Sequence, residues 1–109
     1  MRRIYHLTTL EAWQKAAGKS YRADSLDSEG FIHCSNADQV ARSAKRFYAD
    51  AAELFALRLD ADRLGTTLRD EPASNGEVFP HVYGPIEPEA VVEICPMRRG
   101  PDGKWVFGS

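Results

Sequence analysis

The second half of the chain is divided into short apolar segments by closely spaced turn residues. Residues 53–59, 91–97 and 104–107 form such segments, and a weaker one covers 66–69. Glycine, proline, asparagine and aspartate between the segments favour turns. Segments of this length are typical of strands rather than of helices. We therefore expect this half of the chain to consist mainly of strands joined by turns.

The first half combines strands with helical segments. Residues 3–8 alternate as a strand does, and Thr8 with Glu11 forms a capping box that opens a short helix, which Gly18 ends. Residues 19–30 are polar and lack periodicity, which predicts a long loop.

A short strand over 31–34 then leads into a second helix over about 36–49, with Ser35 as its cap. The apolar residues of this helix recur at helical spacing, which predicts that they form its buried stripe. They are Ala37, Val40, Ala41, Ala44, Phe47 and Tyr48.

The composition is that of an ordinary globular domain. The chain has 109 residues, of which 43% are hydrophobic and 28% charged, and this length is near the commonest domain size. Residues 1–109 are therefore expected to form a single domain. Short strands together with two early helices indicate an α+β fold with a mainly antiparallel sheet.

Charge and cysteine content exclude several functional classes. A net charge of -2 argues against nucleic-acid binding driven by bulk charge. Cys34 and Cys95 lack the CxxC spacing and are expected to stay reduced. No stretch approaches the roughly 20 apolar residues that span a bilayer, and the start does not resemble a signal peptide. We expect a soluble cytoplasmic protein without a membrane partner.

All three histidines lie in unusual local contexts. His6 is in the middle of the first strand, and His33 ends the strand that precedes the second helix. His81 lies between Pro80 and Pro85, whose rings fix φ and stiffen the segment. A single strand histidine is usually structural, but three in such contexts predict a shared polar cleft. The cleft is expected to bind an anionic, phosphate-bearing small molecule.

Further polar residues are candidates for this cleft. The start of the second helix presents free N–H groups, so Ser35 and the helix start are expected to bind an anion. Glu29 and Glu71 lie near strand ends, where a carboxylate faces either a ligand or solvent. Ser25, in the long loop, and Tyr83, beside His81, complete the expected ligand-binding set.

A zinc site is the alternative use of three histidines. However, the sequence has no HxH or HxxxH pair to supply a local chelate, and Cys34 would point away from His33 on a strand. No metal is therefore expected. No GxSxG, GxGxxG or P-loop pattern is present either. The sequence therefore does not indicate the nucleophilic serine of an α/β-hydrolase, a Rossmann fold or a P-loop nucleotide site.

Several motifs together resemble a bacterial family designated domain of unknown function 952. The resemblance extends from Arg3 to Gly103. The residues that carry it are Ile4-Tyr5-His6, Trp13, Ser25-Leu26, Glu29-Gly30-Phe31-Ile32-His33-Cys34-Ser35, Gln39, Phe47-Tyr48, Glu71 and Phe79-Pro80-His81-Val82-Tyr83-Gly84-Pro85.

The resemblance implies the fold of ADP-ribosyltransferases and of NAD-using RNA 2′-phosphotransferases, which has a split, mostly antiparallel sheet. It implies that His6 matches the first motif of that superfamily and residues 31–35 the second. Glu71 is the candidate for the third, with His81 as an alternative. NAD would then be a substrate, with His6 on a ribose hydroxyl, Ser35 on a phosphate and Glu71 beside the developing cation.

These expectations leave several functions open. The first is an NAD-using transferase or glycohydrolase in which His6, His33, His81 and Glu71 are catalytic. The second is a non-catalytic module that binds a nucleotide, ADP-ribose or another phosphorylated metabolite. A third is a hydrolase or a metal-assisted enzyme that uses its histidines directly. A structural or partner-binding role is the last.

Overall fold

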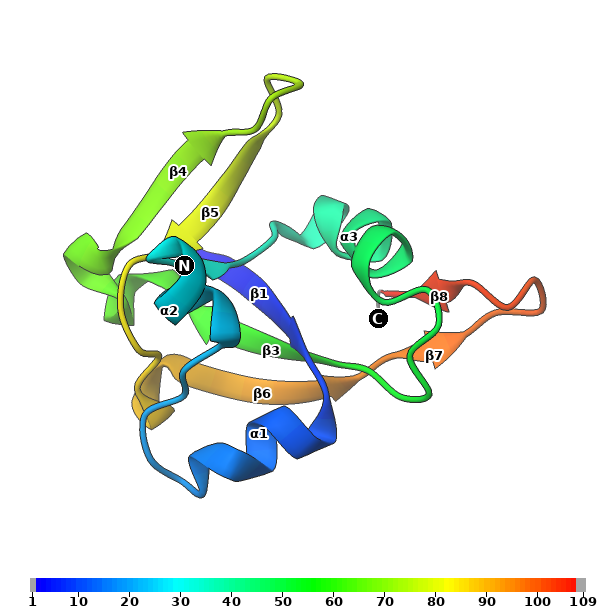
Figure 1. Cartoon of the computed structure of the whole chain (residues 1–109), viewed down its shortest axis with the longest axis horizontal. Coiled ribbons are helices and arrows are strands. Elements are labelled where there is room, and N and C mark those ends of the chain that lie inside the picture. The colour runs from blue at the N-terminus through cyan, green and yellow to red at the C-terminus, as the bar shows by residue number, and fades with distance from the viewer. Residues whose placement is uncertain (1, 108–109) are drawn as a thin grey trace.

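Two three-stranded antiparallel sheets and a small hairpin form the frame of the molecule (Figure 1). The structure, a computed structural model, describes residues 2–107. The strand order is β1-β3-β6 in the first sheet and β2-β5-β4 in the second, and β7 pairs with β8. The strands are β1 Arg3–Thr8, β2 Ile32–His33, β3 Phe55–Asp60, β4 Leu68–Pro72, β5 Val78–Val82, β6 Val91–Pro96, β7 Arg98–Arg99 and β8 Trp105–Val106. The expectation of an α+β domain with a mainly antiparallel, divided sheet is confirmed.

The first sheet is buried on both faces around β1. Because side chains alternate along a strand, Ile4 points into one apolar cluster and Leu7 into another. The Ile4 cluster lies between the first sheet and the second. The Leu7 cluster lies on the opposite side, where α3 packs beside the hairpin strand β8. Both clusters draw on β3, which contributes Leu57 to the first and Ala56 to the second.

A backbone bridge next to the histidines ties the two sheets together. Tyr5 of β1 donates to the carbonyl of Ser35 at 2.8 Å, and the Ser35 amide donates to Tyr5 at 2.7 Å. Because Ser35 closely follows β2, this bridge holds the edge of the second sheet against the first. The β4–β5 hairpin projects beyond this junction, as Figure 1 shows.

The helices are short. The α-helices are α1 Leu10–Ala16, α2 Asp24–Glu29 and α3 Val40–Phe47, and 3-10 turns occupy Ala37–Gln39, Ala61–Arg63, Gly65–Thr67 and Pro88–Ala90. The predicted first helix is present, but its cap is Thr9, whose side chain accepts from the Ala12 amide at 3.2 Å. It ends at Ala16, and its C-cap Ala17 lies in the left-handed region at φ 50°, before Gly18.

The predicted loop over 19–30 is wrong, because this segment contains α2. The helix has six residues, and Leu26 packs half-buried against the core from its single turn and a half. A helix so short shows too little periodicity to be distinguished from a polar loop. Gly30 ends it at φ 90°, a conformation that favours glycine, and the chain turns into β2.

The second predicted helix is shorter than expected and has a narrower buried side. A 3-10 turn opens it, and Asn36 with Gln39 forms the capping box in place of Ser35. Of the predicted stripe, Val40 and Ala44 are buried and Tyr48 is half-buried. The remaining members, Ala37, Ala41 and Phe47, are exposed. A helix of this length contacts the core only through the side that faces β1 and β8.

β6 forms one edge of the first sheet. Its side chains Val92 and Ile94 are 48% and 41% exposed, and Glu93 forms an ion pair with Arg58 of β3. Pro96 is the last residue of the strand. Separately, none of the helices within residues 2–107 is long and apolar enough to cross a membrane.

Candidate functional site

Two of the three histidines face each other on neighbouring strands of the second sheet. His33 of β2 and His81 of β5 are directly paired in the antiparallel register. Residues paired in this way point to the same face of a sheet. Their ring centroids are 5.5 Å apart and the ring planes are inclined at 78°. The fold therefore brings together two imidazoles that are distant in the sequence.

An aromatic ring lies against both imidazoles. Phe31 stacks on His81 with centroids 4.2 Å apart and an interplanar angle of 22°. The same ring meets His33 edge-on at 4.8 Å and Tyr83 at 5.3 Å. Such contacts restrict the rotamers of both histidines. Phe31 was not among the predicted site residues, although its spacing of two from His33 places it on the same strand face.

Glu71 orients the ring of His81. Its Oε1 lies 2.8 Å from His81 Nδ1 and accepts from the Tyr83 hydroxyl at 2.5 Å. The Tyr83 hydrogen bond, and then that of His81, hold the pKa of Glu71 below its ordinary value. The same contact raises the pKa of Tyr83. Because an ionised carboxylate only accepts hydrogen bonds, His81 Nδ1 carries the proton and neutral His81 exposes a lone pair at Nε2.

Glu29 orients the ring of His33 in the same way. It is the last residue of α2, and its Oε2 lies 3.0 Å from His33 Nε2. The two side chains are about half exposed, at 50% and 51%. The left-handed turn at Gly30 makes this contact possible, because it folds the end of α2 back beside β2. Within residues 2–107, no hydrogen bond reaches His33 Nδ1 or His81 Nε2.

A cation completes the cluster. Arg69 of β4 is paired with His81 in the register, and its guanidinium lies 5.0 Å from the centroid of the Tyr83 ring. No local sequence pattern indicates Arg69, because its position beside His81 follows from the β4–β5 register. We call this surface the paired-histidine face. It consists of Glu29, Phe31, His33, Arg69, Glu71, His81 and Tyr83.

His6 lies in the core instead. It is 6% exposed, and its Nδ1 donates to the carbonyl of His33 at 2.7 Å. Its Nε2 accepts from the Tyr21 hydroxyl at 2.9 Å, and Thr8 lies 2.9 Å from that hydroxyl in turn. Burial lowers the pKa of His6 to about 4. The expectation of one cleft shared by three imidazoles is therefore corrected: two lie at the surface, and the third is a neutral, fully hydrogen-bonded core residue.

The start of the second helix is not an open anion site either. Ser35 is 5% exposed, and its hydroxyl lies 3.1 Å from that of Ser43. Gln39 accepts from the Asn36 amide at 2.8 Å. These contacts fill the place predicted for a phosphate. Ser25 lies half-buried on α2, where its carbonyl accepts from Gly30 at 3.1 Å, and within residues 2–107 it makes no hydrogen bond to the paired histidines.

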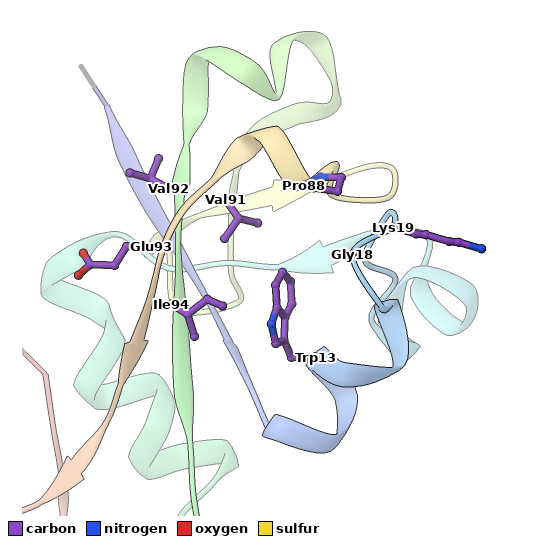
Figure 2. Close-up of a pocket in the computed structure, with 8 residues that line it drawn as sticks. All are labelled: Trp13, Gly18, Lys19, Pro88, Val91, Val92, Glu93 and Ile94. Carbon is purple, nitrogen blue, oxygen red and sulfur yellow. The ribbon is translucent and has the colours of Figure 1, made fainter.

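Two hollows of the surface lie elsewhere. The first, of about 330 Å³, is largely apolar and runs between Trp13 and the β6 side chains (Figure 2). The second, of about 360 Å³, is lined by residues that include Tyr5, Arg58 and Arg98. Neither is lined by a histidine, so the paired histidines lie on a sheet face rather than in either hollow. Within residues 2–107, no three metal-ligating side chains are grouped so that they could hold a metal ion.

The family is decided by the extent of one match. The model of the protein family of unknown function DUF952 matches residues 7–94. The chain belongs to the DUF952 family. The matched segment of this DUF952 chain contains every residue of the paired-histidine face, and His6 lies just before it. None of the curated proteins matches the chain.

Solved structures of one relative share the fold. The chain is similar to the crystal structure of protein CC0527 from Caulobacter crescentus, with a TM-score of 0.87 and 27% identity over 95% of this chain and 93% of that one. A double mutant of CC0527 gives a TM-score of 0.86 and 26% identity, with the same coverage. The solution NMR structure of CC0527 gives 0.80 and 29%, over 95% and 91%.

Proposed function

We propose that the paired-histidine face binds a small phosphate-bearing molecule and moves a proton on it. The observation that carries this proposal is the pair itself. Each imidazole has one nitrogen fixed by a glutamate at 2.8 or 3.0 Å and leaves the other nitrogen open. A histidine held by a carboxylate in this way is oriented for proton transfer. A purely structural pair would have no need of two separate carboxylates.

The surrounding side chains suit such a ligand. Protonated imidazole and the Arg69 guanidinium both donate to phosphate oxygens. Phe31 and Tyr83 add aromatic surface next to these donors, which suits a planar group such as a nucleobase. Glu29 and Glu71 repel a phosphate, and the guanidinium of Arg69 offsets part of that repulsion.

A ligand screen by thermal shift tests the proposal. Inorganic phosphate, nucleotides, phosphosugars, NAD and ADP-ribose are added at pH 6 to the wild type and to His33→Gln and His81→Gln. A ligand at a hundred times its Kd adds about 2.7 kcal/mol of stability. We expect a shift for the wild type that both variants lose. Arg46→Gln, an exposed change on α3, is the matched control. No shift with any ligand would refute the proposal.

NAD-using chemistry is a second candidate, and it rests on Glu71. A reaction that breaks the nicotinamide–ribose bond develops positive charge on the sugar, which an ionised carboxylate stabilises. Glu71 has a lowered pKa and is 33% exposed on the paired-histidine face. The family resemblance to ADP-ribosyltransferases favours this reading, but His6 and Ser35 are buried away from any ligand. Release of nicotinamide from NAD, lost in Glu71→Gln, would favour it. Binding of NAD without turnover would favour a non-catalytic module.

A further inference from the structure

We infer that the ligand is a singly charged phosphodiester, which His81 as base and His33 as acid cleave. This inference rests on the proposed function, since it assigns the substrate class and the separate roles of the same two imidazoles. It is carried by three features of the paired-histidine face: its charge, the unequal exposure of the two histidines and the lack of serine, threonine and cysteine among its members.

Charge selects the diester. The fixed charges of the face are the carboxylates of Glu29 and Glu71 and the guanidinium of Arg69. When one imidazole is protonated, positive and negative charges on the face cancel. A phosphodiester adds one negative charge to this balance, whereas a phosphomonoester dianion adds two beside the existing carboxylates. The face therefore suits the diester better.

The base is His81. Its side chain is 15% exposed, and Glu71 and Phe31 hold it from two sides. With Nδ1 donating to a carboxylate that stays ionised, the lone pair of neutral His81 is fixed at Nε2. The same arrangement makes histidine a general base in enzymes that pair it with a carboxylate. Tyr83 shares the Glu71 oxygen and keeps that carboxylate in place.

The acid is His33. Its side chain is 51% exposed and so exchanges protons freely with water. The carboxylate of Glu29 orients the ring through Nε2. Protonated His33 donates from Nδ1, the nitrogen that Glu29 leaves open. The ring centroids of acid and base are 5.5 Å apart, so both imidazoles reach atoms of one phosphate group.

Water or a hydroxyl of the substrate is assigned as the nucleophile, because the Tyr83 hydroxyl is held by its hydrogen bond to Glu71. The paired-histidine face has no serine, threonine or cysteine. Cys34, the residue after β2, is buried in the core, and burial raises the pKa of its thiol. A covalent enzyme intermediate through a thiolate is therefore not available at this position.

The reaction balances without a cofactor. His81 Nε2 takes a proton from water as the water oxygen forms a bond to phosphorus. The bond from phosphorus to the leaving oxygen breaks with its electron pair on oxygen, and His33 Nδ1 gives that oxygen a proton. The products are a phosphomonoester and an alcohol. Exchange with solvent then returns His81 to its neutral form and His33 to its protonated form.

Two phosphodiesters with different leaving groups test the roles. A 2′,3′-cyclic nucleotide has an alkoxide leaving group that needs a proton, whereas bis(4-nitrophenyl) phosphate releases a phenolate that does not. We expect His81→Gln to lower kcat/KM on both substrates by about 10²-fold or more. His33→Gln should lose a similar factor on the cyclic nucleotide but less than about tenfold on the nitrophenyl ester. Wild-type kcat/KM on the cyclic nucleotide should be bell-shaped with pH.

The controls separate this inference from the proposed function. Arg46→Gln should match the wild type on both substrates, and circular dichroism checks that each variant is folded. Binding of inorganic phosphate is followed through the imidazole proton signals of His33 and His81. Phosphate binding without hydrolysis of either diester overturns this inference and leaves the proposed function standing. Loss of both overturns the two together. Equal losses for His33→Gln on the two substrates overturn the assignment of the acid.

Discussion

His6 and the paired histidines show how one residue type acquires opposite properties within a single small fold. The two nitrogens of His6 contact a backbone carbonyl and a phenol, both neutral, in a site that is 6% exposed. His33 and His81 each contact a carboxylate and leave one nitrogen open at the surface. The comparison teaches that partners and exposure, rather than residue type, decide which imidazole can work as an acid or base.

The two regions are nevertheless connected. The carbonyl that His6 contacts belongs to His33, so a core hydrogen bond of 2.7 Å fixes the backbone beneath one member of the surface pair. β2 has only two residues and cannot be held by its own ladder alone. His6 is thus a positioning residue for the paired-histidine face, and the variants below measure how far the two regions depend on each other.

The largest effect is expected from His6→Ala. Removing this ring leaves a cavity and deprives the Tyr21 hydroxyl and the His33 carbonyl of their partner. Losses of this kind cost about 3–5 kcal/mol. Urea unfolding at pH 7 measures the change, with His33→Ala as the comparison, which should cost about 1 kcal/mol or less because it is an exposed surface change. Equal losses for the two variants would break the distinction between core and surface histidines.

Lowering the pH is expected to reduce the stability of the wild type by slightly less than His6→Ala does. Histidine has an ordinary pKa near 6.5, and His6 in the folded protein has one of about 4. The unfolded chain therefore binds the proton first, and stability falls as the pH drops from about 6.5 to 4. A shift of this size corresponds to about 3 kcal/mol. Urea midpoints of the wild type and His6→Gln at pH 7 and pH 4 isolate this contribution.

The informative quantity is how the stability difference between the wild type and His6→Gln changes with pH. Carboxylates with lowered pKa values, such as Glu77 at about 2, also lose stabilising contacts in acid, and both proteins share that loss. The wild type should lose more stability than His6→Gln over this pH window. Parallel curves would show that His6 is not the group responsible.

A smaller effect is expected at Phe31. The aromatic contacts of this half-buried ring with His81 and Tyr83 are worth about 1 kcal/mol. Phe31→Leu keeps apolar bulk but removes the stacking, so the free energy of unfolding should fall by about this amount. His81 should then sample more rotamers, which NMR line widths of its ring protons detect. An unchanged His81 signal would show that Glu71 alone holds that imidazole.

The smallest effect is expected in the ionisation of Tyr83. Its pKa is raised chiefly by the hydrogen bond to Glu71. Glu71→Gln removes the charge while keeping a similar shape, so the phenol should ionise at lower pH, nearer the ordinary value for tyrosine. Ultraviolet titration at alkaline pH follows the change, and Tyr83→Phe identifies which phenol is responsible. A titration curve identical to the wild type would contradict the contact between these two side chains.

Much of the frame could be predicted from the sequence, because β1, β3 and β6 are short segments rich in apolar residues, and turn residues separate the later ones. The buried environment of His6 could not be predicted from the sequence. β1 is buried on both faces, so alternation places His6 beside Ile4 without saying that the shared face is closed. α2 was missed because Leu26 is the only apolar residue in its six.

The site was predictable in part. The sequence singled out His33, His81, Glu29, Glu71 and Tyr83, which the structure brings together on one face. Which glutamate contacts which histidine depends on the turn at Gly30 and on the register of the second sheet, and neither is visible in a local pattern. Long-range pairing of this kind is fixed by the whole core rather than by neighbouring residues.

The outer strand β6 has a consequence for handling the protein at high concentration. β6 is an edge strand of its sheet and carries the exposed side chains of Val92 and Ile94. The backbone amides and carbonyls along such an edge form a template on which another molecule can assemble. Pro96 lacks an amide hydrogen and interrupts such assembly at one end, while the charge of Glu93 disfavours close stacking of identical copies. Residues of these two types at a sheet edge disfavour edge-to-edge assembly, so engineering of this strand should leave both in place.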